Sequence, residues 1–376
     1  MRTAVVGLPP DYAYPGDTRL WWRDTTAQAA NLGAAFITRS LVHQLGAESV
    51  PVTVDPTELA DRYDRVVLAL ATHLHRRRDV SPLLRLVEAV DLPVHAFSLG
   101  MEDYLDEDAV TGSALSDYRL DPTVHRLLSI VADRSDAIGC RGPWSAEVLV
   151  ANGFDRVVPF GCPSAFWQLT PDIAVSDPVI EPASTVGVFH RSLVDIPHLL
   201  HRIPLWLGQD FQDQALMTGD LQHDALLSEK NRRFLEGRPG ADVLHAVARS
   251  RGVWPRSYAE WIDRLVGASF VVGPRLHGCV AALAHGVPAL LLTRDVRTRE
   301  MVQSLGLPAL PLEAAGQLDL ADLVDAVDLD AFRARYRSAF ASYRGLLDRL
   351  GVPHRLGSGD EVLAGGDKTL RGAARP

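Results

Sequence analysis

Short apolar runs alternate along this chain with segments in which apolar residues recur every three to four positions. The runs are rich in Val, Ala and Leu and are bounded by Gly, Pro or charged residues, which is typical of buried strands in a parallel sheet. The segments between them have the spacing of amphipathic helices. One example is 34–45, whose apolar face consists of Phe36, Ile37, Leu41 and Leu45. This alternation predicts parallel βαβ units and an α/β fold.

The predicted elements fall into two halves of the chain. In the N-terminal half, strands are expected at 2–7, 50–54, 65–71, 94–99, 137–140 and 157–160, and helices at 34–45, 82–90, 127–132 and 146–151. In the C-terminal half, a strand at 185–189 starts a second alternation through 205–208, 242–248, 258–265, 270–273, 280–284 and 289–292, followed by helices at 320–327 and 332–350. Each half therefore has the element order of a Rossmann-like unit.

Residues 170–183 separate the two halves. This segment contains three prolines and three acidic residues and has no long apolar period, which indicates a linker. A chain of 376 residues also exceeds the size at which a single core stops growing, about 250–300 residues. We therefore predict an N-terminal Rossmann-like domain at 1–170 and a C-terminal one at 184–350. Residues 357–376, rich in Gly, Ala and Arg, are expected to form a disordered tail.

The composition bears on the cellular compartment of the protein and on the classes of partner that it could bind. The net charge of −9 disfavours nucleic acid as a partner. Cys140, Cys162 and Cys279 are too few and too widely spaced for a disulfide framework or a zinc site, so we expect buried thiols and a reducing, cytoplasmic setting. The N-terminus lacks a secretory apolar region, and no apolar run reaches the ~20 residues of an integral membrane segment. A peripheral location at the inner face of the membrane, through a lipid-linked substrate, stays open.

Several familiar catalytic motifs are absent. The sequence contains no G-x-x-x-x-G-K-[ST], no G-x-G-x-x-G after its first strand, no H-E-x-x-H and no G-x-S-x-G. Kinase, nicotinamide oxidoreductase, zinc protease and α/β-hydrolase activities therefore have no support in the sequence.

The strongest chemical signal lies in residues 269–292. The pattern predicts a buried strand, a turn, a short helix and a second strand, with Arg275 and His277 at the start of the helix. Helix N-termini carry unpaired N–H groups and a partial positive charge, so they bind anions. A guanidinium can grip a carboxylate or phosphate, and an imidazole can exchange a proton near neutral pH. The segment predicts an anion site with a proton donor; the alternatives are a structural salt bridge for Arg275 and a buried capping role for His277.

This segment also carries a family resemblance. The sequence G-P-R-L-H-G, a small-residue helix and then G-V-P-A is similar to the C-terminal signature of the polysaccharide pyruvyl transferases. Other segments of the chain resemble further motifs of that family, in the same order. These are Asn31-Leu32-Gly33, the segment Cys140-Arg141-Gly142-Pro143-Trp144-Ser145 with its continuation to Asn152-Gly153, and Phe160-Gly161-Cys162-Pro163-Ser164. The resemblance covers residues 28–310.

The resemblance implies two Rossmann-like lobes that face a cleft in a glycosyltransferase-B-like layout, with the acceptor on the N-terminal side and the donor on the C-terminal side. It implies transfer of pyruvate from phosphoenolpyruvate to a sugar of a cell-surface polysaccharide or of its lipid-linked oligosaccharide precursor, as a ketal. His277 and Arg275 would be catalytic, and Gly278 would bind substrate. Phosphoenolpyruvate is a co-substrate and no cofactor is expected, while a need for a divalent metal stays open.

Two other functions stay open beside this one. A nucleotide-sugar glycosyltransferase of the same fold would use the same helix terminus for a diphosphate. An inactive subunit of a glycan-assembly complex is the non-enzymatic alternative, because Ala34 stands where the family often has a polar residue.

Arg141 is predicted to bind substrate from the other half of the molecule. It ends a strand and precedes a helix, as Arg275 does. Paired cations from opposite lobes would suit a dianionic donor. An ion pair of Arg141 with Asp133 or Asp136 is the alternative.

Four more residues are predicted to bind substrate. His190 and Arg191 directly follow the strand at 185–189, a position at the carboxyl end of a parallel sheet. Asn31 and Gly33 lie where a loop enters a helix, and Gly33 permits close backbone approach.

Overall fold

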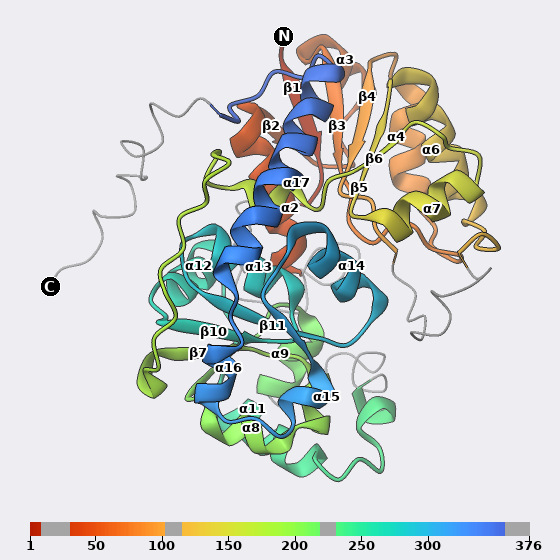
Figure 1. Cartoon of the computed structure of the whole chain (residues 1–376). Coiled ribbons are helices and arrows are strands. Elements are labelled where there is room, and N and C mark those ends of the chain that lie inside the picture. The colour runs from red at the N-terminus through yellow and green to blue at the C-terminus, as the bar shows by residue number, and fades with distance from the viewer. Residues whose placement is uncertain (9–30, 102–114, 219–230, 358–376) are drawn as a thin grey trace, which may run out of the picture.

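The first half of the chain forms a parallel sheet. The computed structural model of the protein describes residues 1–8, 31–101, 115–218 and 231–357. The first sheet has four strands in the order β2-β1-β3-β4, and the short β5–β6 sheet is joined to its edge by a bridge between Leu99 and Cys140 (Figure 1). These strands are β1 (Thr3–Val6), β2 (Glu48–Val50), β3 (Arg65–Ala69), β4 (Val94–Phe97), β5 (Ile138–Cys140) and β6 (Val157–Pro159).

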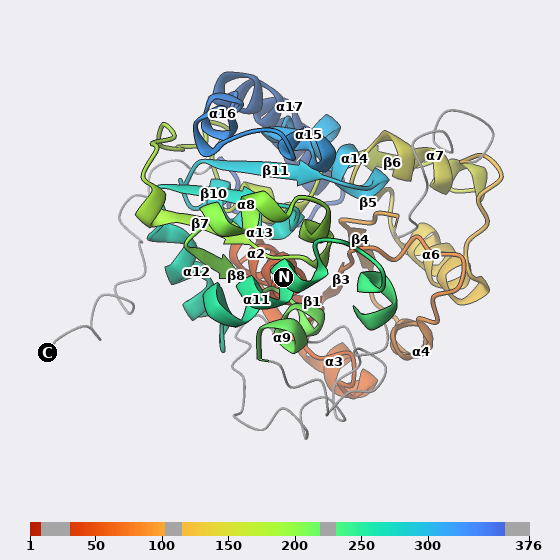
Figure 2. The same ribbon diagram turned by 90° about the horizontal axis from the view of Figure 1, so that it is seen from below.

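The second half forms a six-stranded sheet in the order β12-β11-β10-β7-β8-β9, in which every neighbouring pair is parallel. Figure 2 shows β11, β10, β7 and β8 side by side. The strands are β7 (Thr185–Val188), β8 (Leu205–Leu207), β9 (Gly252–Val253), β10 (Phe270–Gly273), β11 (Ala289–Thr293) and β12 (Ala309–Pro311). The predicted fold class, α/β with two Rossmann-like lobes in a glycosyltransferase-B-like arrangement, is confirmed.

Helices connect the strands and cover the sheets. The N-terminal lobe comprises the first sheet, the β5–β6 pair and α2 (Leu32–Leu45), α3 (Pro56–Arg62), α4 (Ser81–Ala89), α6 (Pro122–Arg134) and α7 (Pro143–Ala151). The C-terminal lobe comprises the second sheet and α8 (Pro197–Arg202), α9 (Phe211–Thr218), α11 (Ala241–Arg251), α12 (Tyr258–Val266), α13 (Leu276–Ala284), α14 (Val296–Leu305), α15 (Leu312–Ala315) and α16 (Leu320–Asp325). A last helix, α17 (Leu329–Arg349), runs across both lobes.

Local sequence explains where several helices begin. Asp55, Asp121 and Ser257 are side-chain N-caps of α3, α6 and α12, where they satisfy backbone N–H groups that a helix start leaves unpaired. Asp295 and Thr298 form a reciprocal capping box at α14. The apolar pattern predicted helix α6 and an element at 258–265, where α12 lies, but neither α3 nor α14, because α3 buries only Leu59 and α14 is rich in polar residues.

Alternate residues along the strands of the second sheet enter two different cores. In β10, Val271 faces a core shared with α12 and α13, while Phe270 and Val272 face a core that also holds apolar residues of α8 and α11. This is the alternation of side chains in an extended strand. A sheet buried on both faces requires almost wholly apolar strands, which is why the apolar runs were so clear in the sequence.

The two lobes meet through a continuous apolar core. Helix α2 of the N-terminal lobe packs against α12 and α13 of the C-terminal lobe, with the short 3₁₀ helix η1 (Pro163–Phe166) beside both α2 and α13. Tyr343 of α17 stacks on Phe160, with ring centroids 4.6 Å apart, and contacts Phe97 edge-on at 6.0 Å. Helix α17 thus packs against the N-terminal lobe, although its residues lie within the predicted C-terminal domain; the domain limits 1–170 and 184–350 stay a prediction.

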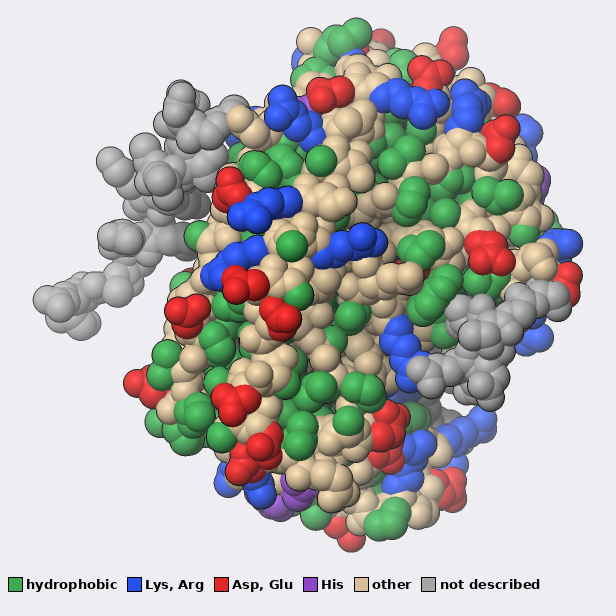
Figure 3. Space-filling view, viewed as in Figure 1, with side chains coloured by type: hydrophobic (Ala, Val, Ile, Leu, Met, Phe, Trp, Pro, Cys, Tyr) green, Lys and Arg blue, Asp and Glu red, His purple; other side chains and the backbone are tan. Residues whose placement is uncertain are grey.

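The face of the molecule drawn in Figure 3 shows no single dominant charge. Basic and acidic side chains are interspersed on the face seen in Figure 3. Across the described ranges, no helix combines the length and apolar character that a bilayer crossing demands. The predicted tail lies, from residue 358 onward, outside the described residues.

Candidate active site

The N-terminus of α13 lies at the carboxyl end of the second sheet, where β10 ends at Gly273. Arg275 occupies the N-cap position, makes no side-chain capping hydrogen bond, and no acidic residue lies in the first turn. Gly278 packs directly against β7, because a Cβ on it would lie 2.5 Å from a methyl carbon of Val188. Gly278 therefore has a packing role in the structure, and its predicted contact with substrate stays a prediction.

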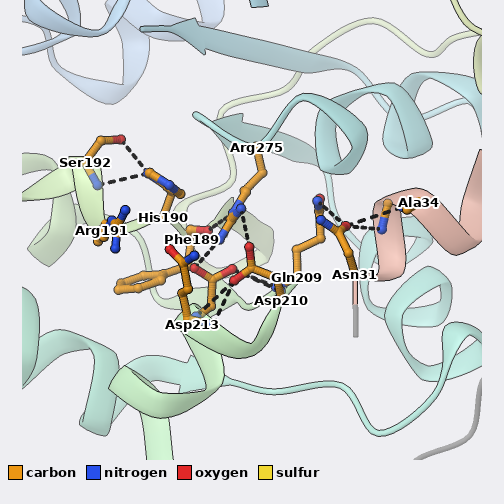
Figure 4. A network of polar contacts seen from close by, with 12 residues as sticks. Asn31, Ala34, Phe189, His190, Arg191, Ser192, Gln209, Asp210, Asp213 and Arg275 are labelled. Carbon is orange, nitrogen blue, oxygen red and sulfur yellow. Dashed lines mark hydrogen bonds and ion pairs between the residues drawn. The ribbon is translucent and has the colours of Figure 1, made fainter. Parts of the chain in front are cut away.

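Arg275 is buried and already paired. Its Nη1 lies 2.7 Å from a carboxylate oxygen of Asp210, its Nη2 lies 2.5 Å from Asp213, and its Nε donates to the carbonyl of Phe189 at 3.1 Å (Figure 4). Burial by itself would lower the pKa of Arg275, but the two carboxylates raise the pKa above its usual value, so the guanidinium stays charged. The salt-bridge alternative for Arg275 is realised, and at most two of its five N–H groups remain for a ligand.

The same ion pairs hold the turn between β8 and α9. Asp213 accepts the backbone N–H groups of Gln209 and Asp210, and Asp210 accepts those of Gln212 and Asp213. These backbone hydrogen bonds therefore hold both carboxylates in position for their ion pairs with Arg275. This places Gln209 at the boundary between the lobes.

Asn31 and Gln209 join the two lobes. Asn31 is the N-cap of α2, and its side-chain oxygen accepts the N–H groups of Gly33 and Ala34 at 3.0 and 3.3 Å. The same oxygen accepts the side-chain amide of Gln209 at 3.1 Å, while the carbonyl of Gln209 accepts the N–H of Leu32 at 3.0 Å (Figure 4). Asn31 therefore has a capping and bridging role in the structure, and its predicted contact with substrate stays a prediction.

His277 lies directly across this boundary from Gly33. A Cβ on Gly33 would lie 2.6 Å from Cβ of His277, so only glycine allows α2 to come this close to α13. The His277 side chain is buried, and Nε2 of its ring lies 3.8 Å from Sγ of Cys162 in the N-terminal lobe. Burial lowers the pKa of His277 well below its ordinary value, and the charges of Arg141 and Arg297 lower it further. The ring is therefore neutral near pH 7 in the unliganded protein.

Arg141 reaches the same place from the N-terminal lobe. It directly follows β5, is only 2% exposed, and makes a long hydrogen bond of 3.5 Å from Nε to the hydroxyl of Ser98. Its aliphatic stem packs on Gly100, and a Cβ at position 100 would clash with that stem. Asp136, one of the partners considered for Arg141, pairs instead with Arg156 at 3.7 Å.

His190 and Arg191 differ in how close they come to the site. Burial lowers the pKa of His190 well below its usual value, as do the charges of Arg294, Arg275, Arg191 and Arg297, so several cations surround this imidazole. Its Nδ1 accepts the backbone N–H of Ser192 and caps the short helix that follows β7. Arg191 donates to Asn231 at 3.0 Å and stacks over the ring of Phe234, which ties its head group to the C-terminal lobe.

Four charged residues at and near the start of α14 were not predicted. Arg294 and Arg297 flank Asp295 and both pair with its carboxylate, at 3.5 and 3.0 Å. Glu300 of α14 is fully buried and accepts the backbone N–H and the hydroxyl of Ser145, at 2.6 and 2.7 Å. The sequence signal was the Asp295–Thr298 capping box, which marks the start of α14 immediately after a buried strand.

The three thiols match the prediction, since Cys140, Cys162 and Cys279 are all free and buried. Among the described residues there is no group of three or more His, Cys, Asp or Glu side chains arranged to hold a metal ion. Arg275 pairs with Asp210 and Asp213, and Arg294 and Arg297 pair with Asp295.

Comparison with solved structures gives distant likenesses. UDP-N-acetylglucosamine 2-epimerase from Rickettsia bellii shares 10% identity over 92% of this chain and 95% of its own, with a TM-score of 0.43. HepE from Anabaena, solved in complex with UDP and glucose, shares 11% identity over 93% of this chain and 99% of its own, with a TM-score of 0.41. Likeness at this level says nothing about activity. A search among curated proteins finds no match.

The family comparison is more direct. A family model described as polysaccharide pyruvyl transferase matches residues 31–296. The match begins at the Asn31 cap, contains Arg141, His190 and Arg275-Leu276-His277-Gly278, and ends at the start of α14. It covers most of the chain, so this protein belongs to the polysaccharide pyruvyl transferase family.

Proposed function

We propose that the protein transfers the pyruvyl group of phosphoenolpyruvate to two hydroxyls of one sugar, forming a ketal on a cell-surface polysaccharide or on its lipid-linked precursor. The observation that carries the proposal is the N-terminus of α13. Arg275, its N-cap residue, makes no side-chain capping hydrogen bond, and His277 lies within its first turn, buried against the other lobe. A helix start of this kind favours a phosphate or carboxylate.

Charge supports a donor with two anionic groups. Arg141 and Arg297 both act on the His277 imidazole, while Arg294 and Arg297 act on His190. Asp295 pairs with both Arg294 and Arg297, so two guanidinium groups share one carboxylate beside these imidazoles. Phosphoenolpyruvate carries a phosphate and a carboxylate, and we assign one group to the α13 terminus and the other to the side of Arg141.

The reaction needs two additions at one carbon. A proton joins the methylene carbon of phosphoenolpyruvate, and a sugar hydroxyl adds to C2 with loss of its proton. The C2–O bond to phosphate then breaks, inorganic phosphate leaves, and a second hydroxyl adds to C2 with loss of its proton to close the ring. A bound phosphate raises the pKa of His277, so the imidazole takes up a proton on binding and hydrogen-bonds the departing phosphate.

The acceptor belongs to the N-terminal lobe in this proposal, since Arg141 and Gly33 bring that lobe to the reacting end of the donor. We place the protein in the cytoplasm, at the inner face of the membrane when the acceptor is lipid-linked. The residues of the site supply positioning and charge, and we propose no cofactor.

Binding of phosphoenolpyruvate is the first test. At 100 times its dissociation constant, a ligand of the native state stabilises it by ~2.7 kcal/mol, which thermal unfolding detects. We expect such a shift with phosphoenolpyruvate and none with UDP-sugars. Stabilisation by UDP-sugars alone would instead favour the glycosyltransferase alternative.

Turnover is the second test. Phosphate release from phosphoenolpyruvate should depend on an added glycan, and His277→Gln should reduce it by ~10²–10⁴-fold, the usual contribution of positioned proton transfer. His201→Gln is the matched control, because His201 is exposed on α8. Binding without release over a broad panel of glycans would support the inactive-subunit alternative.

A further inference from the structure

Cys162 lies in the N-terminal lobe, just after β6, and its thiol is completely buried. Two hydroxyls donate to its sulfur, from Ser98 at 3.1 Å and from Ser164 at 3.0 Å. Buried thiols usually act as small apolar side chains. The Cys162 sulfur instead accepts hydrogen bonds from two hydroxyl groups, so its surroundings are polar. Its remaining hydrogen-bonding capacity is the S–H group itself.

The neighbour for that S–H group is His277. The distance of 3.8 Å from Sγ to Nε2 is compatible with a hydrogen bond to sulfur. Within the part of the chain that the structure describes, Cys162 is the single hydrogen-bond partner of the His277 ring. Because two hydroxyls already donate to Sγ, the thiol is left to donate its own hydrogen to Nε2. In a neutral imidazole the proton then sits on Nδ1.

The backbone at Ser98 supports a positioned contact. Ser98 directly follows β4 and has a φ of 66°, a left-handed conformation that is uncommon for residues other than glycine. Such conformations persist where the surroundings impose them, and they cluster at functional sites. This one lets the Ser98 hydroxyl lie between Nε of Arg141 and Sγ of Cys162. A single polar chain thus connects Arg141, through Ser98 and Cys162, to His277 in the opposite lobe.

We propose that Cys162 is a positioning residue that holds the neutral His277 of the free protein in the Nδ1–H tautomer, with Nε2 turned to the thiol and Nδ1–H left to donate to an anion when it binds. This inference rests on the proposed function only for the identity of that anion. The tautomer itself belongs to the free protein. Through this contact, a residue of the N-terminal lobe, which we assign to the acceptor, orients His277 on the donor side.

The test is ¹⁵N NMR of histidine rings in the full-length protein without substrate, with His277 assigned from its loss in His277→Gln. Wild-type protein should show an unprotonated Nε2 and a protonated Nδ1. Cys162→Ala should abolish this preference, and Cys162→Ser should retain it, because a hydroxyl can donate as the thiol does. A protonated Nε2 in wild type, or an unchanged tautomer in Cys162→Ala, would overturn the proposal.

A kinetic readout separates this proposal from the proposed function. Cys162→Ala should lower kcat for phosphoenolpyruvate at least about tenfold, because even a small misplacement of a reacting group can cost ~10²-fold, with recovery in Cys162→Ser. The matched control is Cys279→Ala, since Cys279 is also buried, lies on α13 and donates to the backbone carbonyls of Gly273 and Leu290. If no substrate turns over but the tautomer is as stated, the proposed function fails and the positioning role stands. If turnover depends on His277 while Cys162→Ala keeps wild-type kcat, the positioning role fails alone.

Discussion

Two helix N-termini in this protein follow the same local sequence pattern but differ in what lies against them. Both α7 and α13 follow a short buried strand, and an arginine comes just before each helix, Arg141 and Arg275. At α7 the carboxylate of Glu300, from the other lobe, accepts the N–H and hydroxyl of Ser145. At α13 the N-cap residue, Arg275, makes no side-chain capping hydrogen bond. The same strand–arginine–helix unit therefore serves once to join the lobes and once as a candidate anion site.

The difference comes from what the opposite lobe presents. Helix α14 sends Glu300 into the first turn of α7, whereas α2 presents Gly33, which has no side chain, to the first turn of α13. Burial raises the pKa of Glu300, and the hydrogen bonds from Ser145 oppose that effect. A helix start that already holds a buried carboxylate has no room for a ligand, so the comparison favours the N-terminus of α13 as the substrate site of the proposed function.

The largest expected effect is on the arginine of α13. Arg275→Ala should lower the free energy of unfolding by about 3–5 kcal/mol, because it leaves the buried carboxylate of Asp213 without its partner. Urea denaturation measures the change. Arg264→Ala breaks the exposed pair with Glu260 and should cost only about 0.3–0.5 kcal/mol. Equal losses in the two variants would show that Arg275 does not hold the β8–α9 turn as described.

Removing the Glu300 carboxylate from the N-terminus of α7 should make this terminus resemble that of α13. Glu300→Ala leaves two buried donors of Ser145 unpaired, at about 1–3 kcal/mol each, and Glu300→Gln should lose less because it keeps an acceptor. Added inorganic phosphate should then raise the melting temperature of Glu300→Ala more than that of wild type. Glu313→Ala, at an exposed position, is the control. A phosphate effect that is the same in all three proteins would contradict the comparison.

Filling the space beside α13 tests the other half of the comparison. Gly33→Ala forces a methyl group against His277, and overpacking of this kind costs about 1–3 kcal/mol. We expect a higher KM for phosphoenolpyruvate as well, because His277 must move. The control is Gly345→Ala, at a glycine of α17 where an added Cβ would have no atom within 4 Å. Wild-type KM in Gly33→Ala would separate His277 from the donor site.

The smallest effect is on the pH dependence of binding. The pKa of His277 is lowered in the free protein, and a bound anion raises it, so binding takes up a proton. Affinity for phosphoenolpyruvate should therefore increase as pH falls through the bound-state pKa and level off below the free-state pKa, by at most about tenfold, or ~1.4 kcal/mol, per pH unit. Calorimetry across pH measures this. His277→Gln keeps only the titration of the ligand phosphate, and an unchanged slope in that variant would exclude His277 as the coupled group.

The sequence predicted the fold better than the roles of individual residues. Strands such as β10 are buried on both faces, so their apolar runs were evident, and the order of strands and helices then implied two parallel sheets. The pairing of Arg275 with Asp210 and Asp213 was not predictable in detail, because those carboxylates lie some 60 positions away and meet it only through the fold. Glu300 was missed for the same reason, since its partner Ser145 is 155 positions away.

The unbroken apolar core between the sheets has a further consequence, for folding. One cluster of buried residues extends from Val5 in β1 and Phe36 in α2 to Leu291 in β11 and Leu347 in α17. Neither half can retain its share of that cluster once the other is gone. The chain should therefore melt in one cooperative transition in calorimetry, and fragments cut at the segment between the halves should aggregate when expressed separately.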